Sequence, residues 1–215
     1  MKLTKYEHSC VVLEKEGKTL VIDPGGLSGS FVVPDNCVGV VITHEHFDHL
    51  DQEKLQTILA AKADVKIYTN KAVVALLSEE LKNASVVVSV GDTLRAGDFT
   101  LEFVGGVHEE VRPELTRCEN TGVIVDGEFY HPGDAHFVPE KPVKWIGIPL
   151  NAPWSKVSET NEFVKAVKAR NAVPIHDGLL SEAGVPTYEN HITAACEMVD
   201  TVYHPIKVGE TIELT

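Results

Sequence analysis

The sequence predicts an α+β fold in which two β-sheets pack face to face and helices cover their outer faces. Strand-like segments occur in runs throughout the chain, and helical segments interrupt them in both halves. One continuous apolar segment, VGVVIT at 38–43, has the composition of a strand that is buried on both faces. The chain has 215 residues, 43% of them hydrophobic, and no recognisable linker or repeat, so we expect one domain spanning 1–215.

The first part of the chain is expected to start as a β-meander. Its strands are predicted at 3–7, 10–14 and 19–23, and the last of them ends at a Pro-Gly-Gly breaker. After the apolar strand, Asp51 is the expected N-cap of a helix, with Leu50 and Leu55 as its hydrophobic staple. A strand therefore leads into a loop and then into a helix.

The rest of the chain alternates between strands and helices. Helical patterns are predicted at about 71–81, 158–169 and 189–199. Strands are predicted at 65–68, 86–90, 93–96, 99–104, 121–125, 128–131, 144–148, 172–175 and 211–214.

Composition excludes several classes of protein. The formal net charge is −13, from 19 Lys+Arg and 32 Asp+Glu, and no basic run is present, so nucleic-acid binding is disfavoured. The start, MKLTKYEHSC, lacks an apolar signal-peptide core, and no segment approaches the roughly 20 apolar residues that cross a bilayer. We therefore expect a soluble, cytoplasmic protein without a membrane partner. The four cysteines form no C-x-x-C pair, and the ten histidines favour imidazole and carboxylate as metal-binding groups.

A polar hexad, His44-Glu45-His46-Phe47-Asp48-His49, follows the apolar strand directly. Alternate residues of an extended chain face the same side, so His44 and His46 can bind one ion. Where the chain turns toward the helix, Asp48 and His49 can serve a second ion. A solvated polar loop is the alternative interpretation of this segment.

Three later residues supply what the hexad lacks. His108 follows LEFVGGV, Asp134 ends the turn His-Pro-Gly-Asp, and His176 follows the predicted strand AVPI. Each lies where a strand gives way to a loop, which is where sheets tend to assemble their sites. Taken singly, each could be an ordinary loop residue, but as a set they complete two metal sites.

An H-x-H-x-D-H motif, a later His, a Gly-Asp and a last His, in this order, resemble the metallo-β-lactamase superfamily, whose fold is a four-layer αββα sandwich. The resemblance spans nearly the whole chain. The start, His8-Ser9-Cys10 followed by Asp23-Pro24, resembles the ascorbate-6-phosphate lactonase-like branch of metal-dependent hydrolases. The resemblance implies one metal on His44, His46 and His108, a second on Asp48, His49 and His176, and Asp134 bridging both.

These residue types suit hydrolysis. Neutral imidazole and carboxylate bind Zn²⁺, Mn²⁺ or Fe²⁺, and we expect two divalent ions, zinc first. Two ions about 3.5–4 Å apart can hold a bridging hydroxide as nucleophile and polarise a carbonyl or phosphoryl oxygen. Asp48 is the expected catalytic residue that orients the hydroxide and receives its proton. The expected enzyme is a metal-dependent hydrolase, of the lactonase or phosphodiesterase type, that acts on a small ester, lactone or phosphodiester.

Two residues are candidates for supporting the metals. His8 is expected to face them as a second catalytic residue in contact with substrate, as the resemblance implies, with a packed core histidine as the alternative. Asp23, at the end of an early strand, is expected to buttress a ligand histidine; the alternative is a turn residue in Asp-Pro-Gly.

Four residues are candidates for binding substrate. Asn151 and Trp154 follow a strand end and are expected to form a pocket wall. Arg112 and Arg117, in the loop after His108, can hold an anionic group, or they are simply exposed charges. Two divalent ions concentrate positive charge in one cleft, so we expect a small anionic substrate.

Two other functions stay open. Related sites can hold iron, which makes an iron-dependent redox protein of the same fold the runner-up. The flavodiiron version resembles H-x-E-x-D-H, however, whereas position 46 is His here. A non-catalytic metal-binding or ligand-binding module is the other alternative. The sequence leaves the substrate, the metal and the oligomeric state open.

Overall fold

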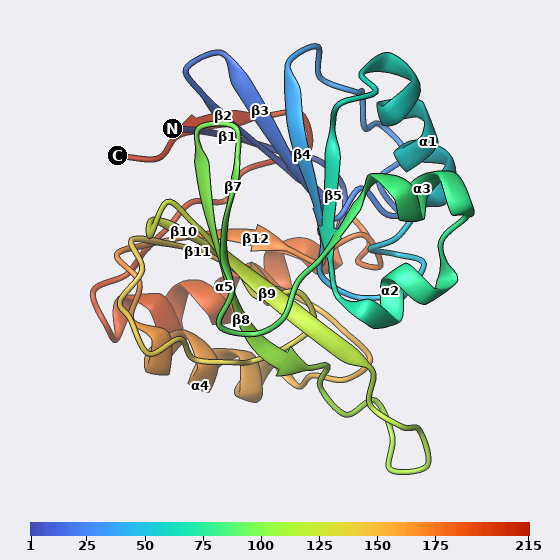
Figure 1. The fold of residues 1–215 in the computed structure, drawn as a ribbon. Coiled ribbons are helices and arrows are strands. Elements are labelled where there is room, and N and C mark those ends of the chain that lie inside the picture. The colour runs from blue at the N-terminus through green and yellow to red at the C-terminus, as the bar shows by residue number, and fades with distance from the viewer.

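The computed structural model describes residues 1–215 and contains two seven-stranded sheets (Figure 1). The first sheet has the order β14-β1-β2-β3-β4-β5-β6. The meander from β1 to β3 is antiparallel, as predicted, and β3 to β6 run parallel. Its strands are β1 (Lys2–Lys5), β2 (Val11–Lys15), β3 (Lys18–Ile22), β4 (Cys37–Ile42), β5 (Lys66–Thr69), β6 (Ser85–Val87) and β14 (Thr211–Glu213).

The second sheet has the order β13-β12-β11-β10-β9-β8-β7. Its first half in sequence, β7 to β10, is antiparallel, and β10 to β13 are parallel. Its strands are β7 (Thr93–Ala96), β8 (Phe99–Val107), β9 (Glu119–Val125), β10 (Phe129–His131), β11 (Trp145–Pro149), β12 (Asn171–Ile175) and β13 (Val202–Tyr203).

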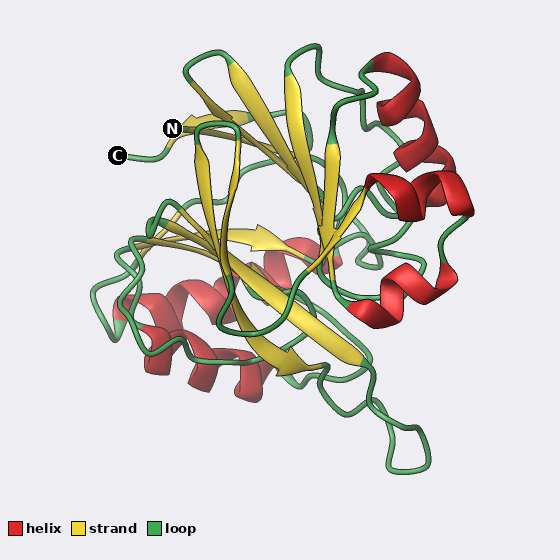
Figure 2. Ribbon diagram, in the orientation of Figure 1, coloured by secondary structure: helices red, strands yellow, loops and turns green.

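Helices cover the outer face of each sheet (Figure 2). On the first sheet lie α1 (Gln52–Ala61), α2 (Lys71–Leu76) and α3 (Glu79–Ala84); on the second lie α4 (Val157–Val167) and α5 (Gly184–Glu197). Apolar side chains form three clusters, one between the sheets and one under each set of helices. The predicted α+β fold, a four-layer αββα sandwich, is therefore confirmed.

Three elements differ from the predictions. The helical pattern at 71–81 is interrupted because Leu77 is extended and Ser78 caps a new helix, accepting a hydrogen bond from the backbone N–H of Leu81. Helix α5 starts at Gly184 rather than near 189, and Pro186 is tolerated in its first turn, where helix N–H groups have no intrahelical partner. The two-residue strand β13 was not predicted, since it is too short to show an alternating pattern.

Strand β4 leads to the site as expected. Five of its six residues are buried, all except Val38, and the strand is flanked by β3 and β5. Asp51 caps α1 by accepting from two backbone N–H groups, which ends the loop that follows β4. At this end the two sheets are joined directly, because the N–H of Thr121 in β9 donates to the carbonyl of Thr43 over 2.9 Å. No helix of the chain combines the length and the apolar character required to span a bilayer.

Candidate metal centre

The seven residues predicted to bind metal lie together, although they come from four separate segments. Together with His8 they form two adjacent groups, within each of which the candidate ligand atoms lie no more than 4.8 Å apart. Most of these side chains are buried, and Asp48 and His46 are half-buried. The groups are His44, His46, His108 and Asp134, and His8, Asp48, His49 and His176.

Asp134 lies between the two groups. One carboxylate oxygen, Oδ2, lies 3.3 Å from Nε2 of His108 and 3.1 Å from Nε2 of His176. The other oxygen, Oδ1, lies 3.0 Å from Nε2 of His49. The side chain therefore contacts histidines of both groups, in the position that a bridging carboxylate requires.

Four of the histidines have one ring nitrogen held by an acceptor outside the centre. Carbonyl and carboxylate oxygens can only accept, so Nδ1 carries the proton and the Nε2 lone pair points toward Asp134. For His44 the acceptor is the hydroxyl of Thr43, whose own proton goes to Asp23 over 2.7 Å. The Nδ1 partners are Thr43 Oγ1 for His44 at 3.1 Å, Asp23 Oδ2 for His49 at 2.7 Å, the Glu109 carbonyl for His108 at 2.6 Å and the Asn151 carbonyl for His176 at 2.6 Å.

Divalent metal ions fit this arrangement. With protons on Nδ1, the contacts of Asp134 with His49 and His176 bring lone pairs together, and a positive charge between them, either a second proton or a metal ion, makes such contacts favourable. Nε2 of His108 and Oδ1 of Asp134 are buried without a hydrogen-bond partner, and buried polar atoms of this kind normally have one. The free donor atoms are imidazole nitrogen and carboxylate oxygen, which suit Zn²⁺, Mn²⁺ and Fe²⁺.

The pKa values of the histidines next to Asp134 also indicate that positive charge is favourable there. Burial alone would lower the pKa of His49, but the carboxylates of Asp134 and Asp23 outweigh it and raise that pKa well above its usual value. The pKa of His176 is raised as well, because Asp134 again outweighs burial. Burial, together with the neighbouring His49, lowers the pKa of His44 well below its usual value. Positive charge is therefore favoured beside Asp134 at His49 and His176, and disfavoured at His44.

Asp48 and His8 face each other in the second group. Nε2 of His8 lies 2.9 Å from Oδ2 of Asp48. Burial would raise the pKa of Asp48, but the hydrogen bond from His8 and the nearby His49 outweigh it and lower that pKa to about 2. Asp48 is therefore a carboxylate at neutral pH, as a metal ligand must be.

Asp23 lies behind the centre and is fully buried. Its Oδ1 accepts from the backbone N–H of Thr43, and its Oδ2 accepts from the Thr43 hydroxyl and from Nδ1 of His49. One carboxylate thus orients His49 directly and His44 through Thr43, which is the position expected for Asp23.

Asn151 and Trp154 lie closer to the ligands than the predicted pocket wall requires. Asn151 reaches His176 with its backbone carbonyl, and Nε1 of Trp154 donates to Oδ2 of Asp134 over 2.7 Å. Trp154 is only 8% exposed. Both residues therefore contact candidate ligands, and their role in a pocket wall stays a prediction.

Arg112 and Arg117 lie in the β8–β9 hairpin, which projects from the body of the protein next to the centre (Figure 1). Nε of Arg117 donates to the carbonyl of His108, and its guanidinium lies 3.5 Å from Glu109. Both arginines are exposed, but Arg117 is engaged within the hairpin by these contacts. A hollow of about 40 Å³ beside His46 and His108 is lined partly by this hairpin.

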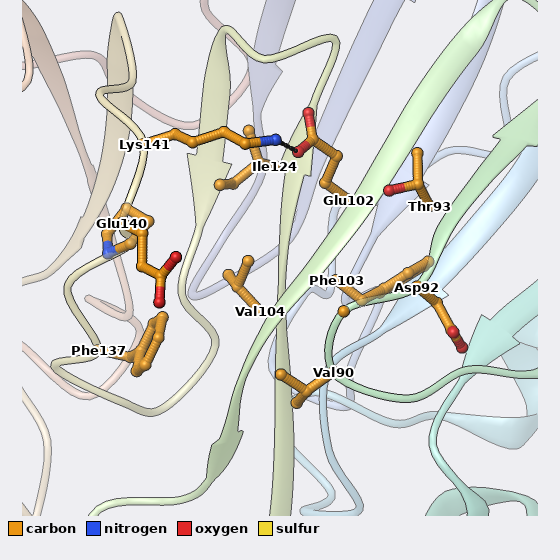
Figure 3. A pocket seen from close by; sticks show the side chains of 12 residues that line it. Val90, Asp92, Thr93, Glu102, Phe103, Val104, Ile124, Phe137, Glu140 and Lys141 are labelled. Carbon is orange, nitrogen blue, oxygen red and sulfur yellow. Dashed lines mark hydrogen bonds and ion pairs between the residues drawn. The ribbon is translucent and has the colours of Figure 1, made fainter.

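A larger hollow, of about 300 Å³, is lined by other residues (Figure 3). Val104, Ile124 and Phe137 point into it, and Lys141 pairs with Glu102 over 2.8 Å at its edge. None of the predicted site residues lines this hollow, so it is separate from the metal centre.

Three residues around the centre were not predicted. Thr43 and Glu109 stand next to ligands in the sequence, and adjacency to a ligand is the signal that could have indicated them. The Sγ atom of Cys118 lies 3.9 Å from Nε2 of His46, while Nδ1 of His46 faces Nε2 of His44 at 3.1 Å. Nothing in the sequence connects Cys118 with a residue 72 positions away.

Comparison with known proteins identifies the family. A family described as the β-lactamase superfamily domain matches residues 2–176, which include all the predicted ligands. The chain belongs to the metallo-β-lactamase superfamily. Protein Rv0786c of Mycobacterium tuberculosis, a similar sequence, is 34% identical over 198 residues, which cover 90% of this chain and 92% of that protein.

Two further similarities extend over the whole chain or almost all of it. A protein of Anoxybacillus flavithermus named UPF0173 metal-dependent hydrolase is 25% identical over 241 aligned residues. The alignment covers 100% of this chain and 100% of that protein. The structure of Igni18, described as a metallo hydrolase from Ignicoccus hospitalis, superposes with a TM-score of 0.75 at 20% identity and covers 98% of this chain and 97% of that one. The latter similarity supports the fold alone.

Proposed function

We propose that this protein is a metal-dependent hydrolase whose centre binds two divalent metal ions. The position of Asp134 is the observation that carries the proposal, since its two oxygens contact histidines of two separate groups. The relatives named metal-dependent hydrolases support the same reaction class.

The ligand sets implied by the resemblance agree with the two groups. His44, His46 and His108 would hold one ion, and Asp48, His49 and His176 the other, with Asp134 shared. Such ions, when bound, supply an activated water and polarise a carbonyl or phosphoryl oxygen. Zinc is the proposed metal, because five of the seven proposed ligands are imidazoles and two are carboxylates; manganese and iron are the alternatives.

The residues of the chain have separable tasks in this proposal. Asp48 is ionised and half-buried, so it can accept a proton at the edge of the centre that water reaches. Asp23, Thr43 and the carbonyls of Glu109 and Asn151 hold the imidazoles in one tautomer, as partners of metal ligands commonly do.

The proposed substrate is a small ester, lactone or phosphodiester that carries a negative charge. Arg112 is the better candidate for binding that charge, because Arg117 is already engaged by the hairpin. Because His8-Ser9-Cys10 resembles the ascorbate-6-phosphate lactonase-like branch, the proposal includes a lactone substrate of that kind.

Metal analysis coupled to a substrate screen tests the proposal. Protein purified without added metal, and then reconstituted with Zn²⁺, should contain close to two ions per chain and hydrolyse at least one ester, lactone or phosphodiester. Folded protein that stays near zero ions in metal-replete buffer would contradict the dinuclear centre. Two bound iron ions with oxygen-dependent turnover and no hydrolysis would favour a redox protein, and two ions without any turnover would favour a binding module.

A further inference from the structure

His8 occupies an unusual place for a residue in a turn. Its side chain is fully buried, and its backbone adopts a left-handed conformation with φ of 60°. Such a conformation is uncommon outside glycine and is maintained only when the surrounding contacts require it. The contacts of His8 therefore indicate what the turn between β1 and β2 is built to do.

The hydrogen bonds of the ring determine where its proton lies. The backbone N–H of Gly178 donates to Nδ1 of His8 over 3.2 Å, and a backbone N–H can only donate. Nδ1 is therefore the acceptor, and Nε2 carries the proton. This is the opposite tautomer to His44, His49, His108 and His176, whose Nδ1 atoms donate.

The Nε2 proton of His8 points at Asp48. It donates to Oδ2 over 2.9 Å, and the same oxygen lies 3.7 Å from Nε2 of His176 and 3.9 Å from Nε2 of His49. A carboxylate oxygen has two lone pairs, so Oδ2 can accept this hydrogen bond and still offer an electron pair to a cation. Neither ring nitrogen of His8 has a lone pair left for a metal ion.

The backbone of His8 holds a second member of the same group. Its carbonyl accepts from the N–H of His176 over 2.9 Å. His176 also has a left-handed φ, of 55°, so both residues of this contact are in unusual conformations. Next to them, the buried ammonium group of Lys5 lies 3.0 Å and 2.9 Å from the two carboxylate oxygens of Asp177. The β1–β2 turn and the loop after β12 are thus tied together by side chains and backbone.

We infer that His8 is a positioning residue, not a metal ligand: its Nε2–H orients Asp48 and its carbonyl orients His176, so that both are in place for the second metal ion. The inference rests on the proposed dinuclear centre and specifies how one half of it is held. It replaces the expectation that His8 contacts substrate.

Two substitutions separate positioning from ligation. In His8→Gln, the side-chain amide can accept from Gly178 with its oxygen and donate to Asp48 with its nitrogen, so binding of the second Zn²⁺ should stay within about 3-fold of wild type. In His8→Leu neither bond is possible, and the dissociation constant of the second ion should rise about 10–100-fold, as for other partners of ligands. The first ion should bind unchanged. His204 packs against Trp145 away from the centre, so His204→Leu is the control for replacing a histidine by leucine.

Titration with Zn²⁺ and the absorption spectrum of the Co²⁺-loaded protein provide the measurements. Equal loss of the second ion in His8→Gln and His8→Leu, with an altered Co²⁺ spectrum in both, would show that His8 is a ligand and overturn the inference. ¹⁵N NMR of the histidine rings in metal-free protein tests it independently of metal binding. The Nε2–H tautomer is expected for His8, and an Nδ1–H tautomer would overturn the inference even if the proposed function holds. A wild-type protein that binds fewer than two ions would instead contradict the proposed function.

Discussion

At the scale of single residues, the candidate ligands and one of their partners, Asp23, could be proposed from the sequence, whereas the other partners could not. The hexad and the three later residues carry their chemistry in their identity and spacing, so the sequence indicated all seven. The residues that fix the tautomers act through a backbone carbonyl, as Glu109 and Asn151 do, or through a hydroxyl, as Thr43 does. A carbonyl is present at every position, so no sequence signal marks the one that is used.

Asp134 and His46 should differ in how many ions their loss removes. Asp134 contacts both groups, so Asp134→Ala should abolish binding of both ions and lower hydrolysis by more than about 100-fold, since even outer partners of ligands contribute 10–100-fold. His46 belongs to one group, so His46→Ala should retain one ion. Elemental analysis and kinetics check both, with circular dichroism as the control for folding. Two ions retained by Asp134→Ala would contradict the shared position.

Asp48 should contribute to stability in a defined range of pH. Its pKa in the folded protein is about 2, below its usual value of 3.8, so the ionised form is favoured by folding. This contribution, about 2 kcal/mol, is complete above the unfolded pKa and is lost as the pH falls toward the folded one.

Urea denaturation in the presence of a chelator measures that contribution. Between pH 5 and pH 2, the free energy of unfolding of the wild type should fall by more than that of Asp48→Asn, and the two curves should converge at the acid end. Parallel curves would mean that Asp48 has the same pKa in both states.

At the scale of elements, the strand that precedes each ligand was predicted within a few residues, because burial imposes an apolar pattern on it. The interruption between α2 and α3 was not predicted, because Leu77 is extended there although no Gly or Pro marks the break. The start of α5 was placed too late because Pro186 indicates a break unless it lies in a first turn. The hexad loop also depends on a neighbouring segment that the sequence does not connect with it.

That segment, the loop after β3, permits a test with a matched control. A Cβ atom at Gly25 would lie 1.9 Å from the backbone oxygen of Asp48, whereas one at Gly29 would have nothing within 4 Å. Gly25→Ala should therefore displace the hexad, destabilise the protein by about 1–3 kcal/mol and weaken metal binding. Gly29→Ala should leave metal binding unchanged and alter stability by less than about 1 kcal/mol. Denaturation and zinc titration of the two variants measure these effects. Equal stability and equal zinc affinity in both variants would show that the two loops do not approach as closely as described.

At the scale of the whole molecule, apolar residues form the core and acidic residues make the surface negatively charged. Three apolar clusters hold four layers together, while most acidic groups remain at the surface. The arrangement of layers followed from the order of strands and helices, but the sequence did not indicate that Asn151 and Trp154 would contact His176 and Asp134. Their orientation depends on the packing of segments distant in sequence, since Trp154 donates to Asp134 across 20 positions.

The net charge leads to a last prediction, which concerns substrate size. Two divalent ions would change the formal charge from −13 to −9, since −13 + 4 = −9, so the protein stays anionic even when its centre is locally positive. A small anion can reach the centre, but a polyanion must also lie against an acidic surface. At about 10 mM salt, where the Debye length is about 30 Å, a labelled RNA 20-mer should therefore show no binding at micromolar protein. Fluorescence anisotropy with the zinc-loaded protein measures this, and the metal-free protein is the control. Tight binding that weakens steeply as salt is added would reveal a basic surface and contradict the prediction. Efficient cleavage of the RNA would also overturn the proposal of a small substrate.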